Sequence, residues 1–174
     1  MYGYDAMLFA ESRHKGQVRK YTGDPYIVHL AEVVGIVASV QHTSAMLSAA
    51  WLHDTLEDTD TTFDELATRF GGEAAALVWS LTDQYVNPEY GNRAARKKAE
   101  ADRLEHVSSQ AKTIKLADMI SNTRSIVTHD HSFARTYLRE KAYLLEKLKA
   151  GDAMLWAKAY GMVMDGVRSL KISL

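Results

Sequence analysis

Proline occurs at only two positions of the chain, 25 and 88, so long stretches contain no residue that breaks an α-helix. Ala and Leu, which favour helices, are the commonest residues, and no segment alternates apolar and polar residues as a half-buried strand does. The sequence therefore predicts an all-α fold. The chain has 174 residues, a length that suits one domain with a substantial core. We expect a single bundle of about eight to ten helices.

Capping residues indicate where these helices begin. The Asp-Pro pair at 24–25 is typical of an N-cap followed by the first helical position. Thr43 or Ser44 should cap the next helix, and Thr62 begins a sequence that resembles a capping box. The expected helices cover residues 2–13, 25–40, 44 to beyond 54, 63–70, 73–81, 93–106, 110–127, 133–150 and 153–170.

Composition excludes several classes of function. The chain contains no cysteine, which rules out disulfides, thiolate zinc sites and cysteine nucleophiles. Its formal net charge is -1, so no overall field attracts nucleic acid or anionic membranes, and anion binding must depend on local patches. Residues 1–13 lack the pattern of a signal peptide, and the longest apolar stretch, near residues 33–40, is too short to span a membrane. We expect a cytoplasmic protein without nucleic-acid or membrane partners.

The stretch 52–58, Leu-His-Asp-Thr-Leu-Glu-Asp, places four ionisable residues directly after an apolar run. If that run continues as a helix, His53 lies one turn from Glu57, and Asp54 lies one turn from Asp58. The histidine and its carboxylate could then bind a metal, and the carboxylates beside them could move protons. The alternative is a helix end that simply becomes polar. Against it, acidic residues at a helix C-terminus oppose the helix dipole at a cost of about 0.3–1 kcal/mol each.

Two further polar side chains stand among apolar residues on expected helices. His29 is flanked in sequence by Ile, Val and Leu, and the alternative to a metal ligand is a hydrogen-bonded core histidine. Asp118 lies in an equally apolar segment, with Lys115 one turn before it and Asn122 one turn after it. This polar stripe could serve function or could be a structural network.

Two histidines and two aspartates together would make a mixed nitrogen and oxygen site. Such a site suits Mn²⁺, Fe²⁺ or Zn²⁺ better than Ca²⁺ or Mg²⁺, and it leaves positions open for water and a substrate oxygen. A basic loop, residues 13–23, precedes the helix that carries His29 and combines glycine, cations and an aromatic residue. Charge runs are usually just solvated, but this one could form a cradle for phosphates and a base.

Three segments resemble a known family. They are Gly-Asp-Pro-Tyr-Ile-Val-His at 23–29, Leu-His-Asp-Thr-Leu-Glu-Asp-Thr at 52–59 and Ile-Lys-Leu-Ala-Asp at 114–118. The adjacent His-Asp pair, with a histidine upstream and an aspartate downstream, resembles the HD superfamily of metal-dependent phosphohydrolases. The segments are most similar to the hydrolase domain of RelA/SpoT enzymes and to small alarmone hydrolases. A chain of this length has no room for a synthetase domain, so we expect a stand-alone HD-type domain over residues 1–174.

The resemblance implies a role for each matching residue. The positions of the family's metal ligands, usually for Mn²⁺, are occupied by His29, His53, Asp54 and Asp118. The acidic pair that activates water is matched by Glu57 and Asp58. The residues that contact substrate are matched by Arg19 and Lys20 in the basic loop, by Asn122 near the ribose and by Arg93 near the pyrophosphate.

The implied reaction is metal-dependent hydrolysis of the 3′-pyrophosphate of an alarmone nucleotide, (p)ppGpp or (p)ppApp, with release of pyrophosphate. Residues 119–123 and the loop 20–23 depart from the long enzymes of the family near the expected nucleotide pocket, so guanine and adenine both remain open. Two alternatives are another HD phosphohydrolase, acting on nucleoside 5′-monophosphates or dNTPs, and a metal-stabilised module that senses nucleotides without turnover. The apolar stripe of the last two helices most simply forms core, and part of it could serve a homodimer.

Overall fold

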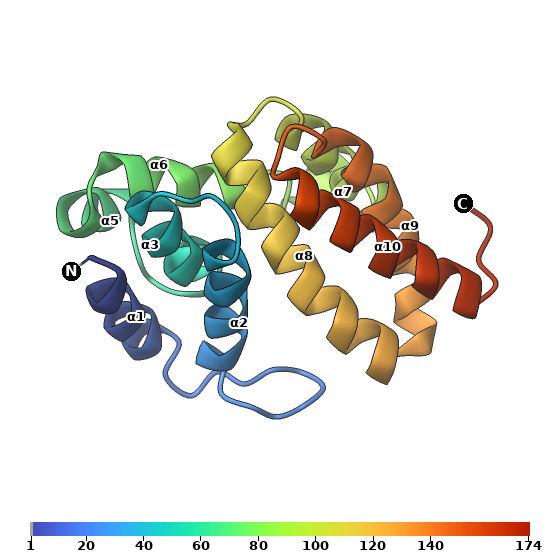
Figure 1. Ribbon diagram of the computed structural model, residues 1–174, viewed down its shortest axis with the longest axis horizontal. Helices are drawn as coiled ribbons and strands as arrows, with labels where there is room; N and C mark the ends of the chain where they lie inside the picture. The colour runs from blue at the N-terminus through green and yellow to red at the C-terminus, as the bar shows by residue number, and fades with distance from the viewer. Residues whose placement is uncertain (1) are drawn as a thin grey trace. The chain divides into compact units, whose positions relative to one another are not determined.

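The computed structural model describes residues 2–174, and the chain divides into two compact units on either side of the junction between Thr82 and Asp83. Within the described residues, every regular element is a helix, and one isolated β-bridge joins Val18 to Pro25 (Figure 1). The prediction of an all-α fold is confirmed. The prediction of a single domain over residues 1–174 stays a prediction.

Helix α3 is the centre of the first unit. This unit contains α1 (Tyr2–Arg13), α2 (Ile27–Ala38), α3 (Ser44–Leu52), α4 (Thr55–Asp58), α5 (Phe63–Phe70) and α6 (Gly72–Leu81). Helix α3 packs against α1, α2 and α6, and α5 packs against α6 (Figure 1). Ser48, Ala49 and Ala50 of α3 are small and buried, and small side chains allow neighbouring helices to approach closely.

Helix α2 begins at Ile27, later than the Asp-Pro pair at 24–25 predicts. Two backbone hydrogen bonds hold this pair in an extended bridge instead. The amide of Arg19 donates to the carbonyl oxygen of Asp24 (2.8 Å), and the amide of Tyr26 donates to that of Gln17 (3.0 Å). Because this pairing needs extended backbone on both sides, the helix starts only after it.

The expected caps of two other helices are confirmed. The hydroxyls of Thr43 and Thr62 each accept a hydrogen bond, at 3.2 Å, from the amide three residues further on. Gly71, with a φ of 88°, separates α5 from α6 in a conformation that favours glycine. The carboxylate of Glu65, the fourth residue of the expected capping box, accepts a hydrogen bond from Arg13 and so ties α5 to the end of α1.

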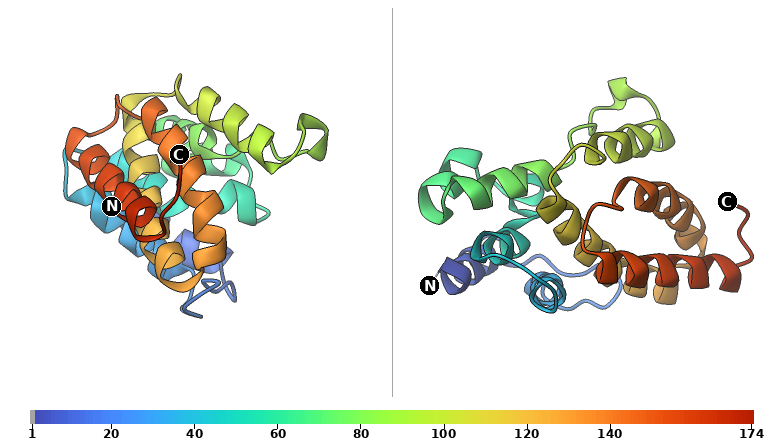
Figure 2. Two further views of the ribbon diagram at one scale, coloured as in Figure 1. Left: turned by 90° about the vertical axis from the view of Figure 1, so that its right-hand side faces the viewer. Right: turned by 45° about the horizontal axis from the view of Figure 1, so that its top comes forward.

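The second unit is built around the long helix α8. It contains η1 (Pro88–Tyr90), α7 (Arg93–Leu104), α8 (Ser109–His129), α9 (His131–Lys147) and α10 (Ala153–Ser169). Helix α9 packs against α7, α8 and α10, and α10 also packs against α8 (Figures 1 and 2). A Cβ on Gly166 would lie 2.9 Å from Cδ1 of Leu138, so glycine permits the close approach of α10 to α9. Among the described residues, no helix has both the length and the apolar character needed to cross a membrane.

Much of the apolar stripe on the last two helices is core, as expected. Tyr137, Leu144, Leu148 and Leu155 are buried. Tyr160 is 41% exposed, and its ring stacks on that of Trp156 with centroids 5.1 Å apart. The stripe therefore contributes to packing within the second unit, and a role in a homodimer stays a prediction.

Candidate metal centre

His29 and His53 lie side by side in the core of the first unit. His29 is in the first turn of α2, and His53 directly follows α3. Each side chain is 2% exposed, the ring centroids are 5.4 Å apart, and a possible ligand nitrogen of one lies within 4.8 Å of one on the other. The packing of α2 on α3 thus pairs two imidazoles in a place where water has little access.

The expectation of one continuous helix through His53 and Asp54 is wrong. Helix α3 ends at Leu52, these two residues form a turn, and the short helix α4 follows. The hydroxyl of Thr55 donates to the carbonyl oxygen of Leu52 (2.7 Å). It competes there with the backbone amide that would continue α3, and such competition disfavours the interior of a helix. The expected pairing of His53 with Glu57 one turn away is therefore replaced by two adjacent side chains on a turn.

The side chains of His29, His53 and Asp54 converge. Oδ2 of Asp54 is 3.0 Å from Nε2 of His53 and 3.7 Å from Nε2 of His29. Nδ1 of His53 lies 2.9 Å from the carbonyl oxygen of Ala50, and donation to this oxygen leaves Nε2 facing the carboxylate. Histidines that ligate metals usually have their second ring nitrogen held in this way. Two buried imidazoles and a carboxylate fit a divalent transition metal.

Tyr26 belongs to this centre although sequence analysis does not identify it. Its hydroxyl donates to Oδ2 of Asp54 (2.6 Å), and its ring lies edge-on to that of His29 with centroids 5.4 Å apart. A hydrogen bond to a ligating carboxylate orients it toward the metal. The only signal in the sequence is that Tyr26 lies in the same short motif as His29, because its contact with Asp54 arises from tertiary packing.

The acidic pair lies on α4, directly after this centre. Glu57 and Asp58 are both exposed, and α4 begins next to Asp54. Oδ2 of Asp58 accepts a hydrogen bond from Nε2 of Gln17 (2.8 Å). The pair is therefore accessible to water, and at least one of its carboxylates is held in a defined orientation. Its catalytic role stays a prediction.

The two cations expected to contact substrate from the basic loop have partners within the first unit. Nη1 of Arg19 is 2.9 Å from Oε2 of Glu32, a residue of α2. Nζ of Lys20 is 3.3 Å from the hydroxyl of Tyr21 and lies over the same ring. The side chain of Arg19 is 9% exposed and that of Glu32 is 41% exposed, so Glu32 holds a largely covered guanidinium in place from the solvent side.

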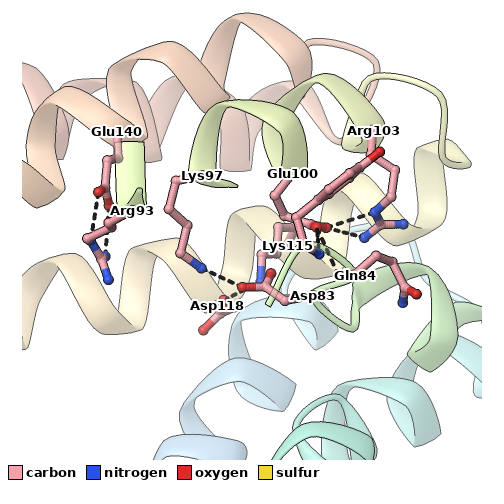
Figure 3. Close-up of polar contacts among 10 residues, drawn as sticks. Asp83, Gln84, Arg93, Lys97, Glu100, Arg103, Lys115, Asp118 and Glu140 are labelled. Atoms are coloured by element: carbon pink, nitrogen blue, oxygen red, sulfur yellow. Dashed lines mark hydrogen bonds and ion pairs between the residues drawn. The ribbon is translucent and has the colours of Figure 1, made fainter. Parts of the chain in front are cut away.

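Asp118 lies in the second unit on α8, within the polar stripe that the sequence predicts. Oδ2 is 3.3 Å from Nζ of Lys115 (Figure 3). Oδ1 accepts a hydrogen bond from Nδ2 of Asn122 (2.6 Å). Asn122, expected to contact a ribose, thus also orients the carboxylate of Asp118. These contacts hold Asp118 in place, and its role as a ligand stays a prediction.

A cluster of three lysines around Asp83 was not predicted. Lys97 of α7 donates a hydrogen bond to this carboxylate (Figure 3). Lys115 of α8 and Lys141 of α9 lie near enough for their charges to act on it. Burial alone would raise the pKa of Asp83, but the three positive charges and the hydrogen bond outweigh burial and lower that pKa. Burial, followed by repulsion from Lys115, lowers the pKa of Lys141 to about 8. Asp83 and Asp118, which pairs with Lys115 at 3.3 Å, are two carboxylates against three ammonium groups, so this lysine cluster keeps one positive charge in excess and can attract an anion.

Arg93 and Glu100 hold the second unit together around the lysine cluster. Nε and Nη2 of Arg93 lie 2.8 and 2.9 Å from the two carboxylate oxygens of Glu140 (Figure 3). Glu100 is buried and accepts hydrogen bonds from the amide of Gln84 (3.0 Å) and from Arg103. It therefore anchors the chain next to Asp83. The expected contact of Arg93 with a pyrophosphate stays a prediction.

Comparison with protein families shows to which family this chain belongs. The sequence profile of the family described as HD domain matches residues 6–152. The chain belongs to the HD-domain family. The match begins in α1 and ends immediately before α10, so this HD domain includes every expected metal ligand and both acidic residues of α4.

The HD domain is similar to proteins of known name. Guanosine-3′,5′-bis(diphosphate) 3′-pyrophosphohydrolase MESH1 of Xenopus tropicalis is 32% identical over 170 residues, which are 92% of this chain and 92% of that protein. The Homo sapiens protein of the same name is 38% identical over 128 residues, 70% of this chain and 68% of its own. A solved structure described as a metazoan ortholog of SpoT that hydrolyses ppGpp superposes with a TM-score of 0.86 at 26% identity, covering 97% and 96% of the two chains. The resemblance inferred from the motifs is confirmed.

Proposed function

We propose that this HD domain is a metal-dependent 3′-pyrophosphohydrolase of alarmone nucleotides, which acts on (p)ppGpp or (p)ppApp and releases pyrophosphate. The observation that carries the proposal is the convergence of His29, His53 and Asp54. It occurs in a chain that aligns over 92% of its length with a 3′-pyrophosphohydrolase. The acidic pair of α4 follows the convergent side chains directly, so groups able to accept the proton of a water stand next to them in the chain.

The metal would be held by His29, His53, Asp54 and Asp118, and we propose that it is Mn²⁺. Support for the first three comes from their convergence, and support for Asp118 comes from the carboxylate that Lys115 and Asn122 hold in a fixed orientation. Mixed imidazole and carboxylate ligands suit this class of metal. The chemistry that a bound ion supplies is a lowered pKa of a water and compensation of charge at phosphorus.

Glu57 or Asp58 would orient the attacking water and accept its proton. Oxygen of this water bonds to the phosphorus next to the ribose 3′-oxygen, the bond between that phosphorus and the 3′-oxygen breaks, and the 3′-oxygen takes up a proton. A carboxylate suits the first proton transfer because it lies on the exposed helix α4, where water reaches it. Proton transfer by such a group contributes about 10²- to 10⁴-fold to a rate.

Cations of the chain would offset the charge of the substrate. Arg19 and Lys20 are proposed to contact the base and phosphates, and Arg93 is proposed to contact the pyrophosphate. The lysine cluster around Asp83 adds three ammonium groups for the same purpose. Asn122 can offer a ribose both a donor and an acceptor.

We further infer a cytoplasmic location, testable by cell fractionation, and a homodimer, testable by light scattering.

The test is an assay of the purified protein with Mn²⁺ that follows pyrophosphate release from ppGpp and ppApp side by side. Asp54→Ala is the inactive control. Turnover of either nucleotide that disappears in the control supports the proposal, and the ratio of the two rates decides the base preference. Failure to turn over both nucleotides, with metal bound, contradicts it, and activity on nucleoside 5′-monophosphates or dNTPs would then identify another HD phosphohydrolase.

A further inference from the structure

A short chain of hydrogen bonds ends on the acidic pair. Nε2 of Gln17 donates to Oδ2 of Asp58 (2.8 Å), and Oε1 of the same amide lies 2.6 Å from Nδ1 of His14. An ionised carboxylate only accepts hydrogen bonds, so the amide nitrogen must face Asp58 and the amide oxygen must face His14. Because that oxygen accepts, His14 donates from Nδ1. The contacts thus fix both the orientation of the amide and the protonated nitrogen of the imidazole.

Contact with Tyr26, a residue of the metal centre, holds His14 in this orientation. The side chain is buried, and its ring lies against that of Tyr26, with centroids 4.9 Å apart and planes inclined by 31°. The hydroxyl of Tyr26 in turn donates to Asp54. Within residues 2–174, Nε2 of His14 has no hydrogen-bond partner, and an unpaired buried polar atom costs about 1–3 kcal/mol. Because the fold accepts this cost at Nε2, we infer that the hydrogen bond from Nδ1 of His14 to Gln17 has a function.

The backbone around Gln17 is anchored on both sides. The amide of His14 donates to the carbonyl oxygen of Ala10 in α1 (2.9 Å), and the amide of Tyr26 donates to that of Gln17 (3.0 Å). Helix α4 is only 4 residues long and cannot orient Asp58 by its own stability. The rigid segment that carries Gln17 therefore supplies the orientation that α4 lacks.

We propose that His14 and Gln17 are positioning residues, which hold the carboxylate of Asp58 in the orientation in which it takes the proton of the attacking water. Gln17 engages Oδ2, and Oδ1 is the atom we assign to the water. His14 keeps the amide of Gln17 from rotating away. This inference rests on the proposed function, because it assigns a role to a residue that acts in the same hydrolysis.

The first test compares Gln17→Ala with Gln41→Ala, which removes an exposed glutamine from the loop between α2 and α3. For Gln17→Ala we expect kcat to fall about 10- to 100-fold, since misplacing a reacting group by about 1 Å costs on this order. KM, bound Mn²⁺ and the melting temperature should match those of the wild type and of Gln41→Ala. A wild-type kcat in Gln17→Ala overturns the proposal, as does a fall in kcat that tracks loss of metal or of folded protein.

The second test asks whether Gln17 acts through Asp58. Asp58→Asn lowers kcat by itself, and adding Gln17→Ala to it should lower kcat no further. His14→Phe, which keeps a ring against Tyr26 but loses the donor, should reproduce part of the fall seen in Gln17→Ala. Additive losses in the double variant overturn the positioning role. Lack of turnover by the wild type overturns the proposed function itself, so the two failures are distinguishable.

Discussion

The two units carry polar centres that are built in different ways. In the first unit, His53 and Asp54 are adjacent in sequence, and His29 joins them through the packing of α2 on α3. In the second unit, the lysine cluster takes one residue from each of α7, α8 and α9. Metal ligands and bases need relative positions accurate to a fraction of an ångström, which two adjacent residues and the packing of two helices provide here. Charge compensation tolerates looser geometry, because it acts over several ångströms.

The two centres also differ in how their carboxylates are held. Asp54 is oriented by Tyr26, and Asp58 by Gln17, each through one directed hydrogen bond. Asp83 instead faces three ammonium groups and forms a hydrogen bond to one of them. We infer that substitutions in the first centre change metal binding and turnover, whereas substitutions in the second change the affinity for anions.

The largest effect is expected for Asp54→Ala. Removing this carboxylate leaves His29 and His53 without the third convergent group, and bound Mn²⁺ should be lost with more than about 10³-fold of the activity. Elemental analysis of the dialysed protein measures the metal, and pyrophosphate release measures turnover. Asp64→Ala, which removes an exposed carboxylate of α5, is the matched control. Metal retained at the wild-type level in Asp54→Ala would contradict the assignment.

The difference between local and tertiary contacts also explains which helix boundaries could be predicted from the sequence. Helices are recognised from local signals, and the hydroxyls of Thr43 and Thr62 cap the helices that the sequence assigns to them. The break at His53 was missed because continuation of α3 depends on whether the Thr55 hydroxyl or a backbone amide occupies the carbonyl of Leu52. The start of α2 was misplaced because a bridge to Val18 overrides the local preference of Pro25.

In the candidate site, too, sequence analysis finds residues with a local signal and misses those that act through tertiary contacts. His29, His53 and Asp54 were identified because a polar residue in an apolar segment is visible in the sequence itself. Tyr26 and Gln17 were missed, since each acts through a contact with a residue that lies 28 or 41 positions away. The lysine cluster was missed for the same reason, because each lysine alone looks like part of an ordinary charged helix.

A smaller effect is expected for Lys97→Met. The change removes one of three ammonium groups near Asp83. A hydrogen bond from such a group to a charged phosphate of the substrate would contribute about 1.5–3 kcal/mol. We expect KM for the alarmone to rise about 10- to 100-fold, while bound metal stays unchanged. Lys98→Met is the control, because this neighbour pairs with Asp102 at 2.7 Å on the exposed side of α7. Equal changes in KM for the two variants would argue against a role for the lysine cluster.

Tyr26→Phe tests the orientation of Asp54, the proposed metal ligand in the first centre. The ring and its contact with His29 remain, but the hydrogen bond to Asp54 is lost. Metal affinity should fall about 10-fold, the lower end of what outer contacts to metal ligands contribute. Titration of the metal-free protein with Mn²⁺ measures it. Tyr143→Phe, which removes a hydrogen bond of equal length to Asp102 in the second unit, should leave the affinity unchanged. Equal affinities in Tyr26→Phe and the wild type would show that the hydroxyl does not support Asp54.

The smallest effect concerns the pH dependence of stability in the second unit. The pKa of Lys141 is lowered from 10.5 to about 8, so between these values the folded chain binds fewer protons than the unfolded chain. The free energy of unfolding must then rise with pH across this window, because the cost of burying a charged amine, and of keeping it near Lys115 and Lys97, disappears. Since Lys141 as a residue is only half-buried, we expect a rise of about 1 kcal/mol. Denaturant titrations at pH 7.5 and about pH 10 should show this rise in the wild type relative to Lys141→Met. A rise of the same size in both proteins would mean that Lys141 keeps its proton in the folded chain, and that the lysine cluster is more strongly positive than its geometry implies.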